Sequence, residues 1–150
     1  MKYCAEVVYR APELAKDETL ILPVLQDVLK KIDAKVVVLL NPTSPIRDPG
    51  LIDHCIRKFL ESGADSLATG FICKYKEYGT YTSRRQDIEG FFYDDGNVYV
   101  MKADLVKKGD RFGKKIERII TDKEQNVDID DDFDFWLAEH ILKKRLGQQE

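Results

Sequence analysis

An acidic segment near the end of the chain contains the residues best suited to bind a metal. Asp128 and Asp130 flank Ile129 in the run VDIDDDFDFWLAE. If 127–129 is a strand, both carboxylates point to the same side, with Cα atoms roughly 6.6 Å apart. At that distance the two charges repel by about 2.5 kcal/mol at an effective dielectric constant of about 20. A hard divalent cation removes this repulsion, and magnesium commonly uses one or two carboxylates together with water and substrate phosphate.

The same segment has a purely structural alternative. Asp131 or Asp132 can cap a final helix, and acidic residues in the first turn of a helix favour its dipole. On the residues alone, capping is the better supported interpretation, because short motif matches are often false positives. The two roles are compatible, since Asp128 and Asp130 could bind metal while the later aspartates cap the helix.

A proline-rich loop, residues 41–47 (NPTSPIR), follows the most apolar run of the chain. Its prolines stiffen the backbone, and Thr43 and Ser44 offer hydroxyls. Arg47 offers a planar fork for a carboxylate or a phosphate. On the residues alone, an ordinary connection whose Arg47 faces water is again the better supported interpretation.

The remaining reactive side chains give weaker signals. Arg10 and the 84–86 segment (RRQ) could face an anionic ligand, but an isolated arginine is more often solvated. His54 and His140 lie on expected helices without an evident partner. Cys55 belongs to the apolar stripe of a helix, which predicts a core residue and not a nucleophile.

Composition limits the classes of protein to consider. With 150 residues, 43% of them hydrophobic and 34% charged, the chain can form one globular domain. Its net charge of −3 does not predict general affinity for nucleic acid or acidic membranes. No apolar run is long enough for a signal peptide or a membrane span. The three cysteines include no C-x-x-C pair, so neither disulfides nor zinc are expected and a cytoplasmic location is predicted.

Strands and helices are expected to alternate along the chain. Strands are predicted at residues 6–9, 35–40, 66–72, 98–101, 116–120 and 127–129, and helices at about 22–32, 49–62, 103–108 and 132–146. Asp48 is predicted to cap the second helix, and Gly63 to end it. In the last helix, Phe133, Trp136 and Leu137 are expected on one buried face with Ile141 and Leu142. Residues 74–89 form an excursion from the sheet, and Asp95-Gly96 is predicted to be a turn.

This alternation predicts an α/β fold with a mainly parallel sheet. In such sheets, ligands bind outside the carboxyl ends of the strands. The 41–47 loop and the 128–130 segment both follow predicted strands. The sequence therefore predicts that they lie at the same edge of the sheet.

Taken together, five segments resemble acylneuraminate-type cytidylyltransferases, the enzymes that couple CTP to sialic-acid-like sugars. In chain order they are EVVYRAPELAKD, VVLLNPTSPIRDP, ESGADSLATG, RRQDIEGFFYDDGNVYVMK and VDIDDDFDFWLAE. The resemblance covers nearly the whole chain. It implies a three-layer, nucleotide-diphospho-sugar-transferase-like (Rossmann-like) fold in one cytidylyltransferase-like domain, residues 1–150. The excursion, taken as residues 72–95, would be a hairpin that could serve dimerisation.

The resemblance also implies roles for individual residues. Asp128 and Asp130 would bind the catalytic Mg²⁺ or Mn²⁺, and Arg10 would lie near the nucleotide phosphates. Substrate contacts are implied for Asn41, Arg47, Arg85, Gln86 and Tyr99. The implied partners are CTP, an acidic nine-carbon sugar and a second copy of the chain. The reaction would be attack of the sugar's anomeric hydroxyl on the α-phosphate of CTP, with release of pyrophosphate.

The chain departs from the family pattern at three places. The family's N-terminal strand and its glycine-rich, basic CTP loop are not found, so the sheet is expected to be truncated at its N-terminus. Asn41 stands where the family has glutamine. Asp95 stands where it has asparagine, and its charge is expected to repel an acidic sugar. These departures leave open a second function, a degenerate or split member that binds a sugar or a partner chain without catalysis.

Overall fold

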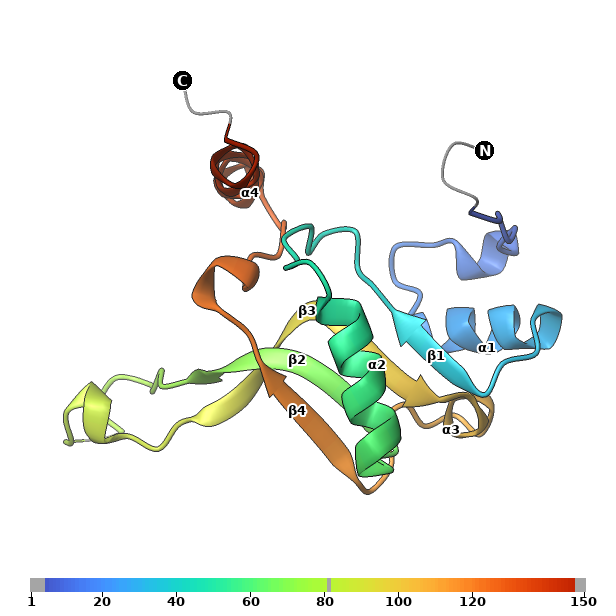
Figure 1. The fold of residues 1–150 in the computed structure, drawn as a ribbon, viewed down its shortest axis with the longest axis horizontal. Helices are drawn as coiled ribbons and strands as arrows, with labels where there is room; N and C mark the ends of the chain where they lie inside the picture. The colour runs from blue at the N-terminus through green and yellow to red at the C-terminus, as the bar shows by residue number, and fades with distance from the viewer. Residues whose placement is uncertain (1–4, 81, 148–150) are drawn as a thin grey trace.

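The computed structural model describes residues 5–80 and 82–147, arranged around a four-stranded mixed sheet (Figure 1). The strand order is β1-β3-β2-β4. The strands are β1 (Val36–Leu39), β2 (Ser66–Cys73), β3 (Phe91–Lys102) and β4 (Ile116–Ile120). β2 and β4 are parallel, whereas β3 runs antiparallel to both β1 and β2. The α/β class is confirmed. Three strands share one direction, and β3 is reversed because a hairpin connects it to β2.

In the part of the chain that the structure describes, four α-helices and three short 3-10 helices accompany the sheet. They are η1 (Pro12–Leu14), α1 (Ile21–Lys31), α2 (Leu51–Ser62), η2 (Arg85–Asp87), α3 (Ala103–Lys107), η3 (Lys123–Gln125) and α4 (Asp132–Arg145). Gly63 ends α2 with φ +63°, as predicted. The predicted cap at Asp48 is wrong, because Gly50 occupies the N-cap position. The Asp48 carboxylate instead accepts hydrogen bonds from Gln125 and Arg145.

The helices cover the two faces of the sheet and make three layers. α2 packs on one face through Cys55 and Phe59, against Val98 and Val100 of β3. α1 and α3 pack on the other face, where the buried residues include Leu25, Leu29, Met101, Ala103 and Val106. Successive β3 side chains thus serve opposite layers, as the period of two in a strand requires.

The Asp95-Gly96 pair lies inside β3, so the predicted turn between two strands is wrong. Ala68 of β2 is opposite Tyr99, but Gly70 is opposite Asp94, so β3 contains extra residues at this point. We call residues 95–97 the β3 bulge. Gly96 has φ +73°, which lets the backbone bend locally while the strand continues on both sides.

Two further predicted strands are wrong. Residues 6–9 form no strand, and their apolar side chains Val7 and Tyr9 are exposed. Residues 127–129 also form no strand. Each segment is short and lacks a paired neighbour, and a strand needs a partner for its backbone groups. Cys4 lies outside the described residues.

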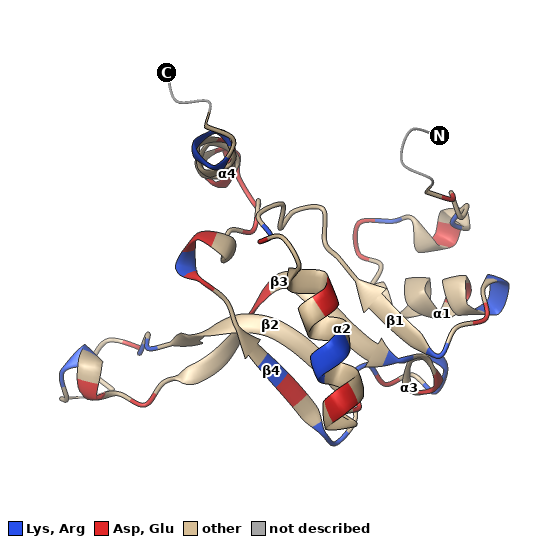
Figure 2. Ribbon diagram, in the orientation of Figure 1, with Lys and Arg blue, Asp and Glu red and all other residues tan. Residues whose placement is uncertain are grey.

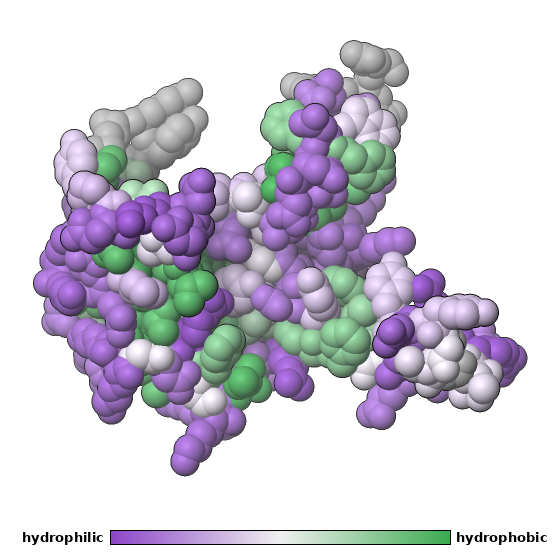
Figure 3. Space-filling model, turned by 180° about the vertical axis from the view of Figure 1, so that it is seen from behind, coloured by the Kyte–Doolittle hydropathy of each residue, from purple (hydrophilic) through white to green (hydrophobic). Residues whose placement is uncertain are grey.

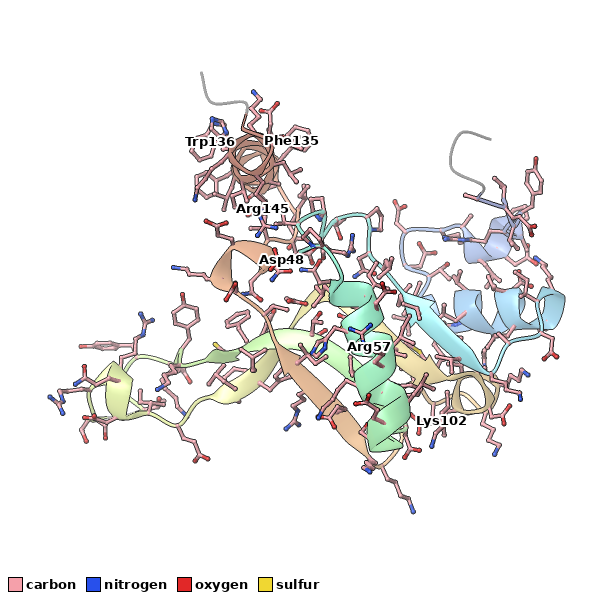
Figure 4. The ribbon with its side chains drawn as sticks, viewed as in Figure 1. Asp48, Arg57, Lys102, Phe135, Trp136 and Arg145 are labelled. Carbon is pink, nitrogen blue, oxygen red and sulfur yellow. The ribbon has the colours of Figure 1, made fainter. Side chains whose placement is uncertain are left out.

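α4 projects from the body of the molecule, and Figure 3 shows hydrophobic side chains on it when seen from behind. Its buried Ala138 packs with Ile46 and Val127. Phe133 and Trp136 were predicted on the buried face, but 65% and 50% of their surface is exposed. Their rings stack on each other with centroids 5.7 Å apart. Figure 4 shows Phe135 and Trp136 pointing away from the rest of the chain. No helix among the described residues is long and apolar enough to cross a membrane.

Candidate functional site

Three segments meet past the end of β1: the loop 41–47 that follows it, the acidic segment 128–130 and the β3 bulge, which lies within β3 beyond Tyr99, the partner of Leu39. The Ile129 N–H donates to the Thr43 carbonyl at 2.9 Å. The hydroxyl of Ser44 lies 3.3 Å from Asp128 Oδ1 and 3.3 Å from the Asp95 carbonyl. Figure 2 shows the acidic segment leading into α4 beside the loop between β1 and α2. The structure thus joins the two segments that the sequence predicted at one edge.

Gly96 lies at the point where the three segments are closest. A Cβ atom on Gly96 would lie 2.7 Å from Ser44 Oγ, 3.4 Å from Asn41 Nδ2 and 3.6 Å from Asp128 Oδ2. No larger residue fits at 2.7 Å without moving the serine. Asn41 and Asp128, two of the predicted site residues, therefore both lie next to this glycine.

Asp95 turns its carboxylate into the core and away from the surface. The residue is 5% exposed, and its oxygens accept hydrogen bonds from Thr69 Oγ1 at 2.6 Å and Thr121 Oγ1 at 2.7 Å. The Asn97 N–H donates to the same carboxylate at 3.0 Å. A buried charge needs such partners, because it has lost its water. The carboxylate is thus not directed at the surface where it was expected to repel an acidic sugar.

Arg47 braces the loop against the β3 bulge. Its Nη2 donates to the Asn41 carbonyl at 2.8 Å, and its Nε donates to the Asn97 carbonyl at 3.1 Å. Burial lowers the pKa of the guanidinium from its ordinary value, and the negative charge of Asp95 opposes that shift. The Arg47 guanidinium was predicted to bind a carboxylate or a phosphate, but at least two of its N–H donors are directed at backbone oxygens.

The acidic segment combines helix capping with two solvent-facing carboxylates. Asp131 is the N-cap of α4 and accepts from the Asp134 N–H at 2.9 Å, as predicted. Asp128 and Asp130 are both exposed. Within residues 5–80 and 82–147, no three His, Cys, Asp or Glu side chains are arranged so that together they could hold a metal ion. Because 127–129 form no strand, the strand spacing that placed both carboxylates on one side does not apply. Carboxylate oxygens are still ligands that a hard cation prefers, with water and phosphate as its other ligands.

The other predicted site residues make their contacts elsewhere. Arg10 is exposed, and its guanidinium donates to the Leu14 carbonyl at 3.5 Å. Arg85 and Gln86 lie near the end of the β2–β3 hairpin, well away from the loop before α2 (Figure 1). The Arg85 guanidinium stacks 4.6 Å above the Tyr75 ring. It also lines a cavity of about 710 Å³ between the hairpin and α4.

Tyr99 faces the sheet layer that α1 and α3 cover. Its hydroxyl donates to Asp94, and the guanidinium of Arg111 lies 5.1 Å from its ring. All three side chains line a cavity of about 360 Å³. Burial, followed by the hydrogen bond to Asp94, raises the pKa of Tyr99. The structure does not bring this tyrosine into contact with Asp128.

Ser44, Gly96 and the two threonines around Asp95 were not predicted as parts of the site. The sequence offered Ser44 only as one hydroxyl of a stiff loop. The pair Asp95-Gly96 favoured a turn, whereas it forms a bulge.

Burial also explains why Cys55, with no exposed surface, has its thiol pKa raised to about 11, as suits a core residue.

Comparisons with curated proteins identify relatives of this chain. No family model matches the chain. The chain is 24% identical over 169 residues to post-translational flagellin modification protein B of Campylobacter coli, covering 97% of this chain and 72% of that protein. It is 27% identical over 153 residues to N-acylneuraminate cytidylyltransferase A of Danio rerio, covering 90% of this chain but only 36% of that protein.

A solved structure has a similar fold. The 4-diphosphocytidyl-2C-methyl-D-erythritol synthase of Anaerococcus prevotii matches with a TM-score of 0.56 and 14% identity. The match covers 78% of this chain and 64% of that enzyme. At this identity the likeness concerns the fold alone. The resemblance of this chain to the acylneuraminate cytidylyltransferase family, predicted from its five motifs, is therefore confirmed.

Proposed function

We propose that this chain is a cytidylyltransferase-like protein that transfers CMP from CTP to a nonulosonic, sialic-acid-like sugar and releases pyrophosphate. The observation that carries the proposal is the exposed Asp128 carboxylate, which lies against a buried serine and a glycine-containing bulge of β3, past the carboxyl end of β1. Ligands bind at this place in α/β sheets. The relatedness to an N-acylneuraminate cytidylyltransferase supports the same reaction class.

In the proposed reaction, the anomeric hydroxyl of the sugar attacks the α-phosphorus of CTP and the bond to pyrophosphate breaks. Asp128 and Asp130 would hold Mg²⁺ or Mn²⁺, which would neutralise charge on the phosphates. Asn41, which lies near Asp128 around Gly96, would contact the sugar. Arg47 would act indirectly, by holding the loop to the β3 bulge.

The more distant candidates belong to a dimeric form of the proposal. Arg85 and Gln86 lie away from Asp128 within one chain, so a second copy would have to bring the 72–95 hairpin to the site. Tyr99 lies in β3 outside this hairpin, so such a dimer would not bring it there. Arg10 would approach the nucleotide phosphates after release from Leu14. A cytoplasmic homodimer acting on CTP and an acidic sugar is the complete form of the proposal.

One observation favours a second candidate, a member of the family that binds ligand without catalysis. Two donors of Arg47 are directed at backbone carbonyls and not toward the acidic pair. Transfer of a nucleotidyl group requires cations around the phosphates. A chain whose Arg47 is engaged in this way could bind a sugar or a partner chain without catalysing transfer.

The test is pyrophosphate release by the full chain with CTP, Mg²⁺ and a panel of nonulosonic acids. We expect turnover with at least one sugar. Asp128→Asn and Asp130→Asn should each lower kcat/KM by about 100-fold, the effect of losing one charge-stabilising group. Asp132→Asn, a matched exposed aspartate in the first turn of α4, should stay within about twofold of the unmodified chain. Sugar binding by calorimetry without turnover of any sugar would replace the proposal with the second candidate.

A further inference from the structure

Ser44 connects the buried interior to the exposed acidic segment 128–130. It is fully buried, yet its hydroxyl contacts a carboxylate of the exposed acidic pair. The same oxygen lies 3.3 Å from the Asp95 carbonyl and 3.3 Å from Asp128 Oδ1. A serine hydroxyl has one proton, so it can donate to only one of these acceptors at a time.

The carboxylate is the stronger of the two acceptors. A hydrogen bond to an ionised group is roughly twice as strong as one between neutral groups. The proton of Ser44 is therefore best used toward Asp128, and this bond restrains the carboxylate at the surface. The Ile129 N–H also donates to the Thr43 carbonyl, which holds the backbone next to Asp128 against the loop that carries Ser44.

The wall behind Ser44 is itself held rigidly. Both oxygens of Asp95 are occupied by threonine hydroxyls, from Thr69 at 2.6 Å and Thr121 at 2.7 Å. These threonines come from β2 and from the residue after β4, so the β3 bulge is tied to its neighbour β2 and to β4 beyond it. Gly96 leaves only enough room for the serine, since a Cβ there would lie 2.7 Å from its oxygen.

We propose that Ser44 is a positioning residue for Asp128, held against the Asp95-anchored β3 bulge so that the carboxylate is preorganised for a divalent cation. The inference rests on the proposed function, because it takes Asp128 as a metal ligand. Groups that orient a ligating carboxylate set metal affinity, and their loss typically weakens it 10- to 100-fold. The serine acts through Asp128 and touches neither substrate nor reacting atoms.

The experiment is a titration of the full chain with Mn²⁺ in the absence of nucleotide and sugar, with water-proton relaxation as the readout of binding. Ser44→Ala should raise the Kd for Mn²⁺ about tenfold. Ser44→Cys, which keeps a weaker donor at nearly the same volume, should give an intermediate Kd. The matched control is Ser66→Ala, since Ser66 is also buried and donates to a backbone carbonyl, that of Phe112. It should leave the Kd unchanged.

Asp128→Asn separates the two levels of the proposal. If it removes Mn²⁺ binding and the Ser44 variants bind as the unmodified chain does, the positioning role is wrong and the metal pair stands. If Asp128→Asn binds Mn²⁺ as tightly as the unmodified chain, the metal pair itself fails, and the role of Ser44 fails with it. Should Ser44→Ala not fold, the Kd of Ser44→Cys decides by the same comparison.

Discussion

The site depends on residues that tolerate close approach between segments. Gly96 combines a positive φ of +73° with contacts that leave no room for a side chain. Asp95 beside it is a buried carboxylate satisfied by two hydroxyls and one N–H. This arrangement makes the β3 bulge a rigid wall, and Asp128 lies against it through Ser44.

Gly96→Ala should lower the free energy of unfolding by about 2–4 kcal/mol. The positive φ accounts for about 1–2 kcal/mol of this loss, and crowding of Ser44 for the rest. Gly63→Ala is the matched control, because Gly63 has φ +63° and nothing within 4 Å of its Cβ position. It should lose only the conformational part. Urea unfolding measures both, and equal losses in the two variants would show that Ser44 moves aside without cost.

Among the secondary-structure elements, an aspartate just before β2 connects three strands. Asp65 Oδ1 pairs with Lys102 Nζ at 2.8 Å, at the end of β3. Its Oδ2 accepts from the N–H groups of Lys114 and Lys115, at 3.0 Å each, just before β4. The hydrogen bond from Lys102, followed by those from the two backbone N–H groups, holds the pKa of this carboxyl well below its ordinary value of 3.8.

Asp65→Asn should therefore change the pH dependence of stability. Because the folded-state pKa is lowered, Asp65 stabilises the fold at pH values above 3.8, and this contribution falls as pH drops below 3.8 toward the folded pKa. The variant should be less stable than the unmodified chain at pH 7, and the gap should narrow at pH 3. Urea unfolding at both pH values checks this.

The control for Asp65 is Asp104→Asn, whose carboxylate is 84% exposed and 3.9 Å from Lys107. It should show little difference from the unmodified chain at either pH, because exposed ion pairs contribute little. A gap between Asp65→Asn and the unmodified chain that is equally wide at pH 3 and pH 7 would mean that the charge of Asp65 does not stabilise the sheet.

Elements with strong local patterns could be predicted from the sequence, and those set by tertiary contacts could not. The apolar stripe of α2 and its end at Gly63 are local signals, and both were found. The β3 bulge was not, because Asp95-Gly96 favours a turn unless Thr69 and Thr121 are known to lie beside it. Likewise 127–129 looks like a strand, but its only described backbone partner is Thr43.

For the whole molecule, the order of the motifs predicted the resemblance to acylneuraminate cytidylyltransferases. It also predicted that the loop 41–47 and the acidic segment 128–130 lie close together. The loop 41–47 and the acidic segment lie together because β1 and β4, the last strands before each of them, run in the same direction and end on the same side of the sheet. The faces of α4 could not be predicted, since the helix is apolar on several sides and only its packing on Ile46 and Val127 decides which face is buried. In Figure 4, Arg145 of α4 and Asp48 lie close together, and their 2.8 Å ion pair holds the end of this helix near the loop.

The central claim is that Asp128 and Asp130 bind a metal–nucleotide complex beside Ser44 and the β3 bulge. The most direct measurement is paramagnetic line broadening in amide NMR spectra of the full chain with CTP and Mn²⁺, referenced to Mg²⁺. We predict the strongest broadening at the amides of 43–44, 96–97 and 128–130, lost in Asp128→Asn. Broadening centred on Asp48 and Glu124, the acidic partners of Arg145, would contradict the account.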